Sequence, residues 1–249
     1  MKKYSTNILV VLFVILLPFI GYAQTNKDSA MNIVKELCNK YNTSKYLSFK
    51  VDYSYRNEDN PEVLQDSLAG QVKINENNYH IVLGNTETIR NNNYNVMLFK
   101  EDTLMYISKP ASSNLNPLSV MDSLLNQISN MDVSLTKTRW QNIITINYPE
   151  GGDYKKAQLF IDIKSGYLVR IKYIVRIALL INPSDRAAVS NNSIQNNWAL
   201  IESAYSQYQQ SAFNDSEFDD KRYFIKDGKE YKPTEAYKQY KIFTASPGL

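Results

Sequence analysis

Residues Ala157 to Leu179 read AQLFIDIKSGYLVRIKYIVRIAL. Apolar residues alternate with polar ones in this stretch, on both sides of a central Lys164-Ser165-Gly166. Successive side chains of a strand point to opposite faces of a sheet, so the pattern predicts a β-hairpin with one buried face and one exposed face. Gly166 suits the turn, because glycine adopts the positive φ values that short hairpin loops require.

The same two-residue period recurs along most of the chain and predicts a mainly β protein. Residues 46–56 alternate cleanly and predict a half-buried strand. A polar loop is expected around Pro61. Further strands are expected over residues 68–74, 79–83, 86–90, 96–99, 104–107, 131–135, 140–148 and 198–208.

Two amphipathic helices are expected to cover the sheet. After an N-cap at Asp28 or Ser29, apolar residues recur at helical spacing, and Cys38 lies on this stripe as a small buried hydrophobe. A second helical pattern runs from Pro117 to Met131. The expected fold class is therefore mainly β (α+β): a curved antiparallel sheet of about nine to eleven strands, forming an open half-barrel plugged by two helices.

The first residues have the pattern of a secretory signal peptide. Lys2 and Lys3 precede an apolar run over residues 8–20, which is too short to cross a bilayer as a helix, and small residues end at Ala23. Retention as a tethering helix is the alternative, but the short run and Pro18 argue against it. We predict cleavage after Ala23 and export of a soluble chain to the periplasm or the cell exterior. No cysteine follows the cleavage point, so lipid attachment is not expected.

The charges and metal-ligating residues exclude several classes of protein. Lys and Arg number 28 and Asp and Glu 25, so the sequence indicates no concentrated basic surface for nucleic acid. One histidine and one cysteine cannot form a zinc site. The acidic run from Asp215 resembles a calcium loop but has Asp220 and Lys226 where an EF-hand needs Gly and Glu. We expect no metal and no other cofactor.

The sequence contains no recognisable catalytic motif. It has neither a Gly-x-Ser-x-Gly elbow nor a phosphate-binding glycine loop. His80, the one histidine, alternates out of phase with the apolar residues of its strand and has no identifiable partner, so we interpret it as an outward strand residue. A carboxylate pair for glycoside hydrolysis needs to meet only in space, and the sequence leaves that open. We expect that the protein is not an enzyme.

Four short motifs resemble an O-glycosylation signal that some diderm bacteria use on exported proteins, an Asp-Ser or Asp-Thr pair followed by a small or aliphatic residue. Helix caps and turns select the same pairs, because Asp and Ser side chains bond to nearby backbone. Both interpretations stay open for Ser29, Ser67, Thr103 and Ser123.

A resemblance to a known family comes from the order of these elements. The signal peptide, a short amphipathic helix, the strand over 46–56, GQVKI at 70–74, the strand over 79–83 and DIKSGYL at 162–168 resemble the periplasmic outer-membrane lipoprotein carrier (LolA-like) family. In that family an incomplete antiparallel barrel is plugged by helices, and its apolar cavity accepts lipoprotein acyl chains. The resemblance covers residues 28 to 179. It implies a soluble carrier, since the lipidation cysteine of a membrane-anchored acceptor is missing.

We therefore predict three parts: a signal peptide (1–23), a carrier-like half-barrel (24–179), and an extension (180–249) that adds a strand and an irregular tail to the same domain. The expected function is to hold acyl chains or another apolar ligand, as in lipid or lipoprotein trafficking. The same apolar residues could instead make a filled core. The predicted ligand-binding residues are Phe49, Val51, Tyr53, Ile81, Leu83, Ile144, Ile146, Ile161, Ile171 and Tyr173.

The alternative function is a non-enzymatic structural or adaptor component of a bacterial cell-envelope or secretion machine. Aromatic residues are enriched in protein interfaces, and the extension is rich in them. Its candidate anchors are Phe224, Tyr231, Tyr237, Tyr240 and Phe243.

Overall fold

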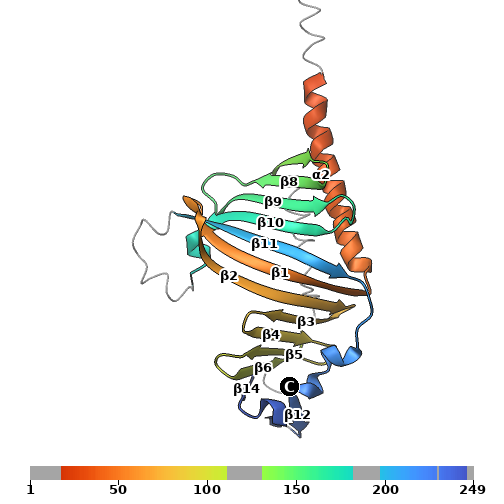
Figure 1. Cartoon of the computed structure of the whole chain (residues 1–249), viewed down its shortest axis with the longest axis vertical. Helices are drawn as coiled ribbons and strands as arrows, with labels where there is room; N and C mark the ends of the chain where they lie inside the picture. The colour runs from red at the N-terminus through yellow and green to blue at the C-terminus, as the bar shows by residue number, and fades with distance from the viewer. Residues whose placement is uncertain (1–17, 111–130, 182–196, 229, 246–249) are drawn as a thin grey trace, which may run out of the picture.

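The computed structural model describes residues 18–110, 131–181, 197–228 and 230–245, and these form one wide, curved β-sheet with an α-helix beside it (Figure 1). The twelve strands of the sheet are ordered β14-β6-β5-β4-β3-β2-β1-β11-β10-β9-β8-β7, and β12 and β13 form a separate pair. Every neighbouring pair is antiparallel except β14 with β6, which is parallel. The expected mainly β, open sheet is confirmed, with more strands than we predicted.

The bounds of the elements follow the predicted periodicity closely. The strands are β1 (Tyr46–Asn57), β2 (Asn60–Asn75), β3 (Asn78–Leu83), β4 (Thr86–Arg90), β5 (Asn95–Phe99), β6 (Leu104–Ser108), β7 (Asp132–Lys137), β8 (Gln141–Asn147), β9 (Tyr154–Asp162), β10 (Leu168–Arg176), β11 (Trp198–Gln209), β12 (Phe224–Asp227), β13 (Glu230–Pro233) and β14 (Lys241–Thr244). The described residues also include the 3-10 turns η1 (Ile177–Leu179), η2 (Asp215–Phe218), η3 (Asp220–Arg222) and η4 (Glu235–Tyr237).

The hairpin of β9 and β10 confirms the prediction made for residues 157–179. Leu159 pairs with Ile171 across the two strands, and Gly166 in the turn has a φ of +67°. Two details differ. A register shift follows Leu168, so Val169 is half-buried where we predicted a buried residue. The strand also ends at Arg176, because residues 177–179 form η1.

Two local predictions are wrong. The helix α2 (Pro18–Thr43) already includes the ten described residues before the predicted cap at Asp28. The expected loop around Pro61 is the first part of strand β2, although its residues are exposed. Its pairing with β1 holds at Asn60 and from Leu64 onward, and Pro61 to Val63 lie between these pairs without a partner on β1. The second predicted helix, from Pro117, falls on residues 111–130, which lie outside the described residues.

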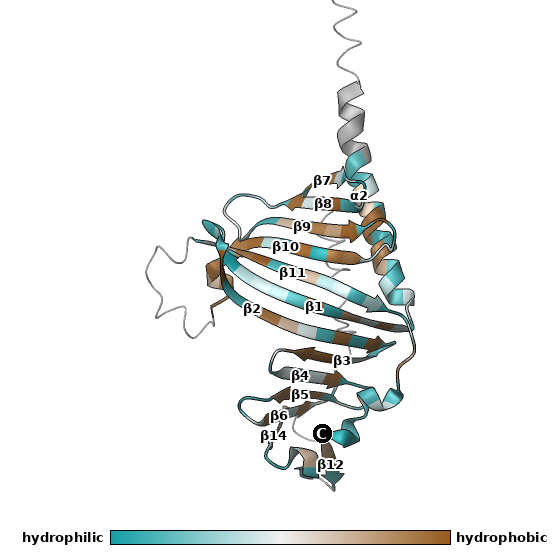
Figure 2. Cartoon of the chain, viewed as in Figure 1, coloured by the Kyte–Doolittle hydropathy of each residue, from teal (hydrophilic) through white to brown (hydrophobic). Residues whose placement is uncertain are grey.

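Helix α2 runs across the strands on one side of the sheet, at the end that contains β7 to β10 (Figure 1). Its buried stripe consists of Ala30, Val34, Leu37, Cys38 and Tyr41, all of them predicted, and the predicted Ile33 is half-buried beside them. These side chains form one core cluster with residues from β1, β2 and β7 to β10. Figure 2 shows hydrophobic residues on these strands and again on β3, β5 and β6, away from the helix.

Strand β11 lies in the middle of the sheet although it comes late in the sequence. It pairs with β1 on one side and β10 on the other, so that Ser203 is opposite both Tyr53 and Ile171. The predicted strand near the start of the extension is therefore confirmed. It is an internal strand of the sheet, and without it β1 and β10 would have no common neighbour.

The tail after β11 packs on the opposite face of the sheet from α2. Phe218, Tyr223 and Phe224 form a second core cluster with one face of strands β4, β5 and β6. The strand residues of this cluster are Ile89, Val96, Leu98, Met105 and Ile107. The tail thus covers one face of β5 and β6. The expected cover from the segment that starts at Pro117 falls outside the described residues and stays a prediction.

Candidate apolar ligand site

The site is built on the face of the sheet that α2 contacts, called here the apolar face. The structure divides the ten predicted ligand-binding residues into two groups. Six are buried in the cluster beneath α2: Phe49, Val51, Ile144, Ile146, Ile161 and Ile171. Four are half-buried and pack at the margin of that cluster: Tyr53, Ile81, Leu83 and Tyr173.

Beneath α2 the apolar face is packed by aromatic side chains. The Tyr208 ring stacks on Tyr167 at a centroid distance of 4.3 Å, and the Tyr208 hydroxyl donates to the Leu168 carbonyl at 2.7 Å. The hydroxyls of Tyr41 and Tyr208 lie 2.7 Å apart. Burial raises the pKa of both phenols far above the ordinary value, so both stay neutral. These contacts tie α2 to β10 and β11.

The apolar face continues beyond α2 across β3, β4, β5, β6 and β14. The register places one row of side chains side by side across these strands: Ile81, Thr88, Met97, Tyr106 and Phe243. The Tyr106 ring stacks on Phe243 at 5.2 Å. Tyr106 is 38% exposed and its neighbours are half-buried, so this part of the face is accessible.

A cleft of about 420 Å³ lies over β5 and β6 on this accessible part. This volume is within the usual range for small-molecule sites. The lining residues are Asn95, Met97, Phe99, Asp102, Leu104, Tyr106, Ser108 and Ala245. We did not predict any of them as ligand-binding residues. The sequence did contain a signal for this cleft. Both faces of β5 and β6 are apolar, and Met97, Phe99, Leu104 and Tyr106 alternate along the face that the tail does not cover.

A second cleft of about 370 Å³ lies over the neighbouring strands β1, β2 and β11. It contains one predicted residue, Tyr53. Its lining residues are Tyr53, Ser54, Tyr55, Asp66, Ser67, Leu68, Leu180 and Ile201.

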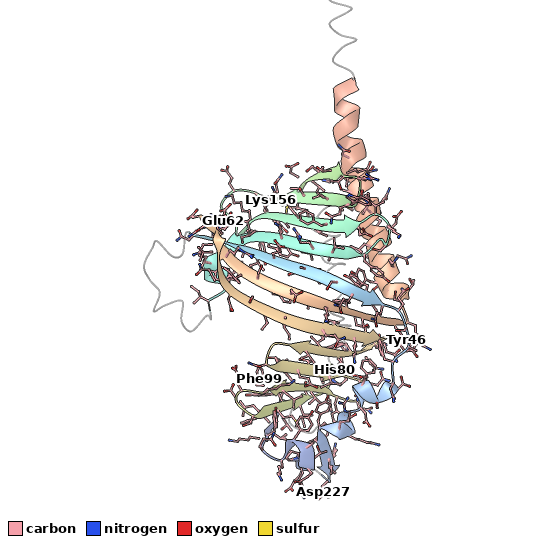
Figure 3. The ribbon with its side chains drawn as sticks, in the orientation of Figure 1. Tyr46, Glu62, His80, Phe99, Lys156 and Asp227 are labelled. Atoms are coloured by element: carbon pink, nitrogen blue, oxygen red, sulfur yellow. The ribbon has the colours of Figure 1, made fainter. Side chains whose placement is uncertain are left out.

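A charged network lies on the opposite face and corrects our interpretation of His80. The His80 ring nitrogens are 3.0 Å from a Glu87 carboxylate oxygen and 3.2 Å from one of Glu217, so the histidine has partners that the sequence did not reveal. Lys100 pairs with Glu87 at 2.8 Å and Lys73 with Glu217 at 2.9 Å. The network joins η2 of the tail to β2, β3 and β4 (Figure 3 labels His80).

Burial opposes ionisation of Glu87, but hydrogen bonds from His80, Lys100 and Tyr223 outweigh it and lower the pKa of Glu87 to about 2. The hydrogen bond with Lys73 likewise lowers the pKa of Glu217. Each carboxylate is paired with a lysine, Glu87 with Lys100 and Glu217 with Lys73. Through Glu217 the network holds the tail on the sheet.

The acidic residues near Asp215 also serve this attachment. Asn75 donates to the Asp215 carboxylate at 3.2 Å, and Asn91 donates to Asp220 at 2.5 Å. Within the described ranges, no group of three or more His, Cys, Asp or Glu residues is arranged to hold a metal ion.

The predicted glycosylation sites have different settings. Ser67 is exposed on β2, Thr103 lies half-buried in the turn before β6, and Ser29 is half-buried on α2. Ser123 lies outside the described residues. Modification of these sites remains a prediction.

Comparison with known proteins gives distant structural similarity. No protein-family model matches the sequence, and no curated protein matches it either. Two solved structures illustrate this similarity. A LolA superfamily protein from Nitrosomonas europaea has a TM-score of 0.33 at 9% identity, over 77% of this chain and 98% of that one. The lipoprotein LppX from Mycobacterium tuberculosis has a TM-score of 0.34 at 12% identity, over 75% and 98%.

An uncharacterised conserved protein from Thermus thermophilus has a TM-score of 0.46 at 10% identity, covering 87% of this chain and 99% of that one. None of these distant similarities assigns a function to this chain. Among the described residues, no helix is both long enough and apolar enough to cross a membrane.

Proposed function

We propose that this protein is an exported, non-enzymatic carrier that holds an acyl chain or another apolar ligand in the cleft over β5 and β6. One observation carries the proposal: the apolar face extends beyond the part that α2 covers and there forms a cleft of about 420 Å³. The signal-peptide pattern of residues 2–23 supports export to the periplasm.

The chemistry of the cleft suits an amphipathic ligand. Met97, Phe99 and Leu104 offer apolar surface, and each methylene that they bury contributes about 0.8 kcal/mol. Asn95 and Asp102 offer polar groups for a head group at the rim. The ligand would extend from the cleft toward Ile81 and Leu83, which lie on the same face.

The adaptor alternative receives less support, because the aromatic residues of the tail pack within the molecule. Phe224 is 2% exposed and packs against Tyr94 and Tyr231, and Tyr237 packs against Tyr223. Intramolecular packing accounts for these residues, so their abundance is no evidence for a protein interface.

The test is ligand binding by the full chain. Lipid extraction and mass spectrometry of the purified protein should find acyl compounds, and a fluorescent long-chain fatty acid should bind with saturable signal. Tyr106→Asp should weaken that binding about tenfold or more, because it places a charge in the apolar cleft.

Ile163→Asp is the matched control, since Ile163 is 49% exposed in the turn after β9 and contributes nothing to the cleft. It should bind the fatty acid as the unmodified chain does. Equal loss in both variants, or no acyl binding by the unmodified chain, would refute the carrier.

A further inference from the structure

The outer edge of β2 is unpaired over much of its length. Strand β2 begins at Asn60, but β3 joins it only from Gly70 onward, where Gly70 pairs with Leu83. Figure 1 shows β2 extending well past the end of β3. The segment from Pro61 to Leu68, called here the free edge, therefore pairs with no strand of the described chain except β1. Its partners on β1 are those of Leu64, Asp66, Ser67 and Leu68, and the register shifts on both sides of Leu64.

An unpaired edge presents backbone N–H and C=O groups in the spacing that another strand can bind. At about 3.3 Å per residue the eight residues of the free edge span at most roughly 26 Å, and the register shifts around Leu64 shorten it. A short added strand still fits this length. The turn after β3 limits it at one end, where the Gly84 amide donates to the Ala69 carbonyl. All residues of the free edge are exposed, including Val63 at 46% and Leu64 at 50%.

The charges around the free edge indicate which partner fits. Asp59, Glu62 and Asp66 form no ion pair within the described part of the chain, and Figure 3 shows Glu62 at the outer end of the β1–β2 hairpin. The nearby Glu58 is already paired with Lys155 at 2.6 Å. A second copy of this chain on the same edge would bring acidic residues opposite each other, which is destabilising. A basic strand would be attracted.

The cleft beside the free edge adds side-chain recognition. Leu68 and Asp66 from the edge line it together with Tyr53 and Ile201, and its volume is about 370 Å³. In strand addition the main-chain bonds supply affinity, while pockets for alternate side chains supply specificity. An apolar side chain of the added strand would lean over Leu68, which is 41% exposed, into this cleft.

We propose that the free edge of β2 binds an extended, basic segment of a partner protein, which joins the sheet as an additional strand. Its basic side chains face Glu62 and Asp66, and one apolar side chain enters the cleft at Tyr53 and Leu68. This site lies on other strands than the proposed acyl cleft over β5 and β6, and it is independent of that function.

The experiment titrates the full chain with a synthetic peptide, acetyl-KVRVKLRV-amide, by calorimetry. Two control peptides separate the contribution of charge from that of backbone hydrogen bonds. One has Glu in place of each Lys and Arg. The other is N-methylated at alternate residues, which removes backbone donors but keeps the charges. The parent peptide should bind, and each control should bind about tenfold more weakly or worse. Hydrogen exchange should show new protection of amides in residues 62–68.

The protein variant Glu62→Lys with Asp66→Lys should weaken binding of the parent peptide about tenfold, because it reverses two exposed charges. The matched control is Asp227→Lys with Glu230→Lys, which reverses the charges of two exposed acidic residues on β12 and β13. It should bind the parent peptide as the unmodified chain does. Fatty-acid binding should be unchanged in both variants.

Three results would overturn the proposal: no binding of the parent peptide, equal binding of the N-methylated peptide, or a dimer of the free protein with protected edge amides. The last would show that a second copy takes the edge.

Discussion

The hydroxyl of Tyr223 donates a hydrogen bond to the carboxylate of Glu87 at 2.8 Å, across 136 residues of sequence. Tyr223 belongs to the tail and is fully buried, and Glu87 belongs to β4. The bond therefore joins the last part of the chain to the sheet through a buried polar contact. Together with the contacts of His80 and Lys73 with Glu217, it makes the tail an integral part of the folded structure.

Acid should weaken this attachment. The pKa of Glu87 is about 2 in the folded protein and near 4.5 when unfolded, so its ionised form stabilises the fold above about pH 4.5. That contribution is lost as the pH falls from about 4.5 toward 2. Urea denaturation across this range should show a falling free energy of unfolding.

The variant Glu87→Gln should isolate this contribution. At pH 7 it should lower the free energy of unfolding by about 1–3 kcal/mol, because hydrogen bonds to a charged group are lost, and at pH 2 the difference should almost disappear. Glu230→Gln, at an exposed position 3.8 Å from Lys232, should have little effect at either pH. A constant difference between pH 7 and pH 2 would argue against the ionised network.

Truncation after Leu179 should abolish cooperative folding. It removes β11 from between β1 and β10 and also the tail residues of the second core cluster. Circular dichroism during urea denaturation should show a broad transition or none. A chain ending at Ala245 retains every strand and should unfold as the full chain does. A truncated protein with the full chain's midpoint would contradict the central position of β11.

Substitution of Gly70 should be costly although the residue is small. A Cβ at Gly70 would lie 2.3 Å from the Val82 carbonyl oxygen, a backbone atom that cannot rotate away. Gly70→Ala should therefore lower the free energy of unfolding by about 1–3 kcal/mol, as overpacking does.

Gly152→Ala is the control, since its Cβ would have no atom nearer than 3.6 Å and its φ is not positive. It should unfold within about 0.5 kcal/mol of the unmodified chain. Similar losses in the two variants would mean that loss of glycine, and not the close approach of β2 to β3, causes the effect.

Local patterns in the sequence were sufficient for most strands and for the buried stripe of the helix. Alternation predicted the hairpin of β9 and β10, because a side chain's face follows directly from its position in a strand. The helical spacing of Val34, Leu37, Cys38 and Tyr41 predicted which side of α2 is buried. The start of β2 was missed because exposed strand residues carry no apolar alternation.

The sequence alone therefore established a mainly β chain with its strands and one apolar helix face, because these depend on neighbours in the chain. Long-range pairing decided the rest: the place of β11 between β1 and β10, the two partners of His80, and the separation of the apolar face into a packed part under α2 and an open part over β5 and β6. Residues such as His80 and Glu217 lie 137 positions apart, and no local period records which distant residues meet.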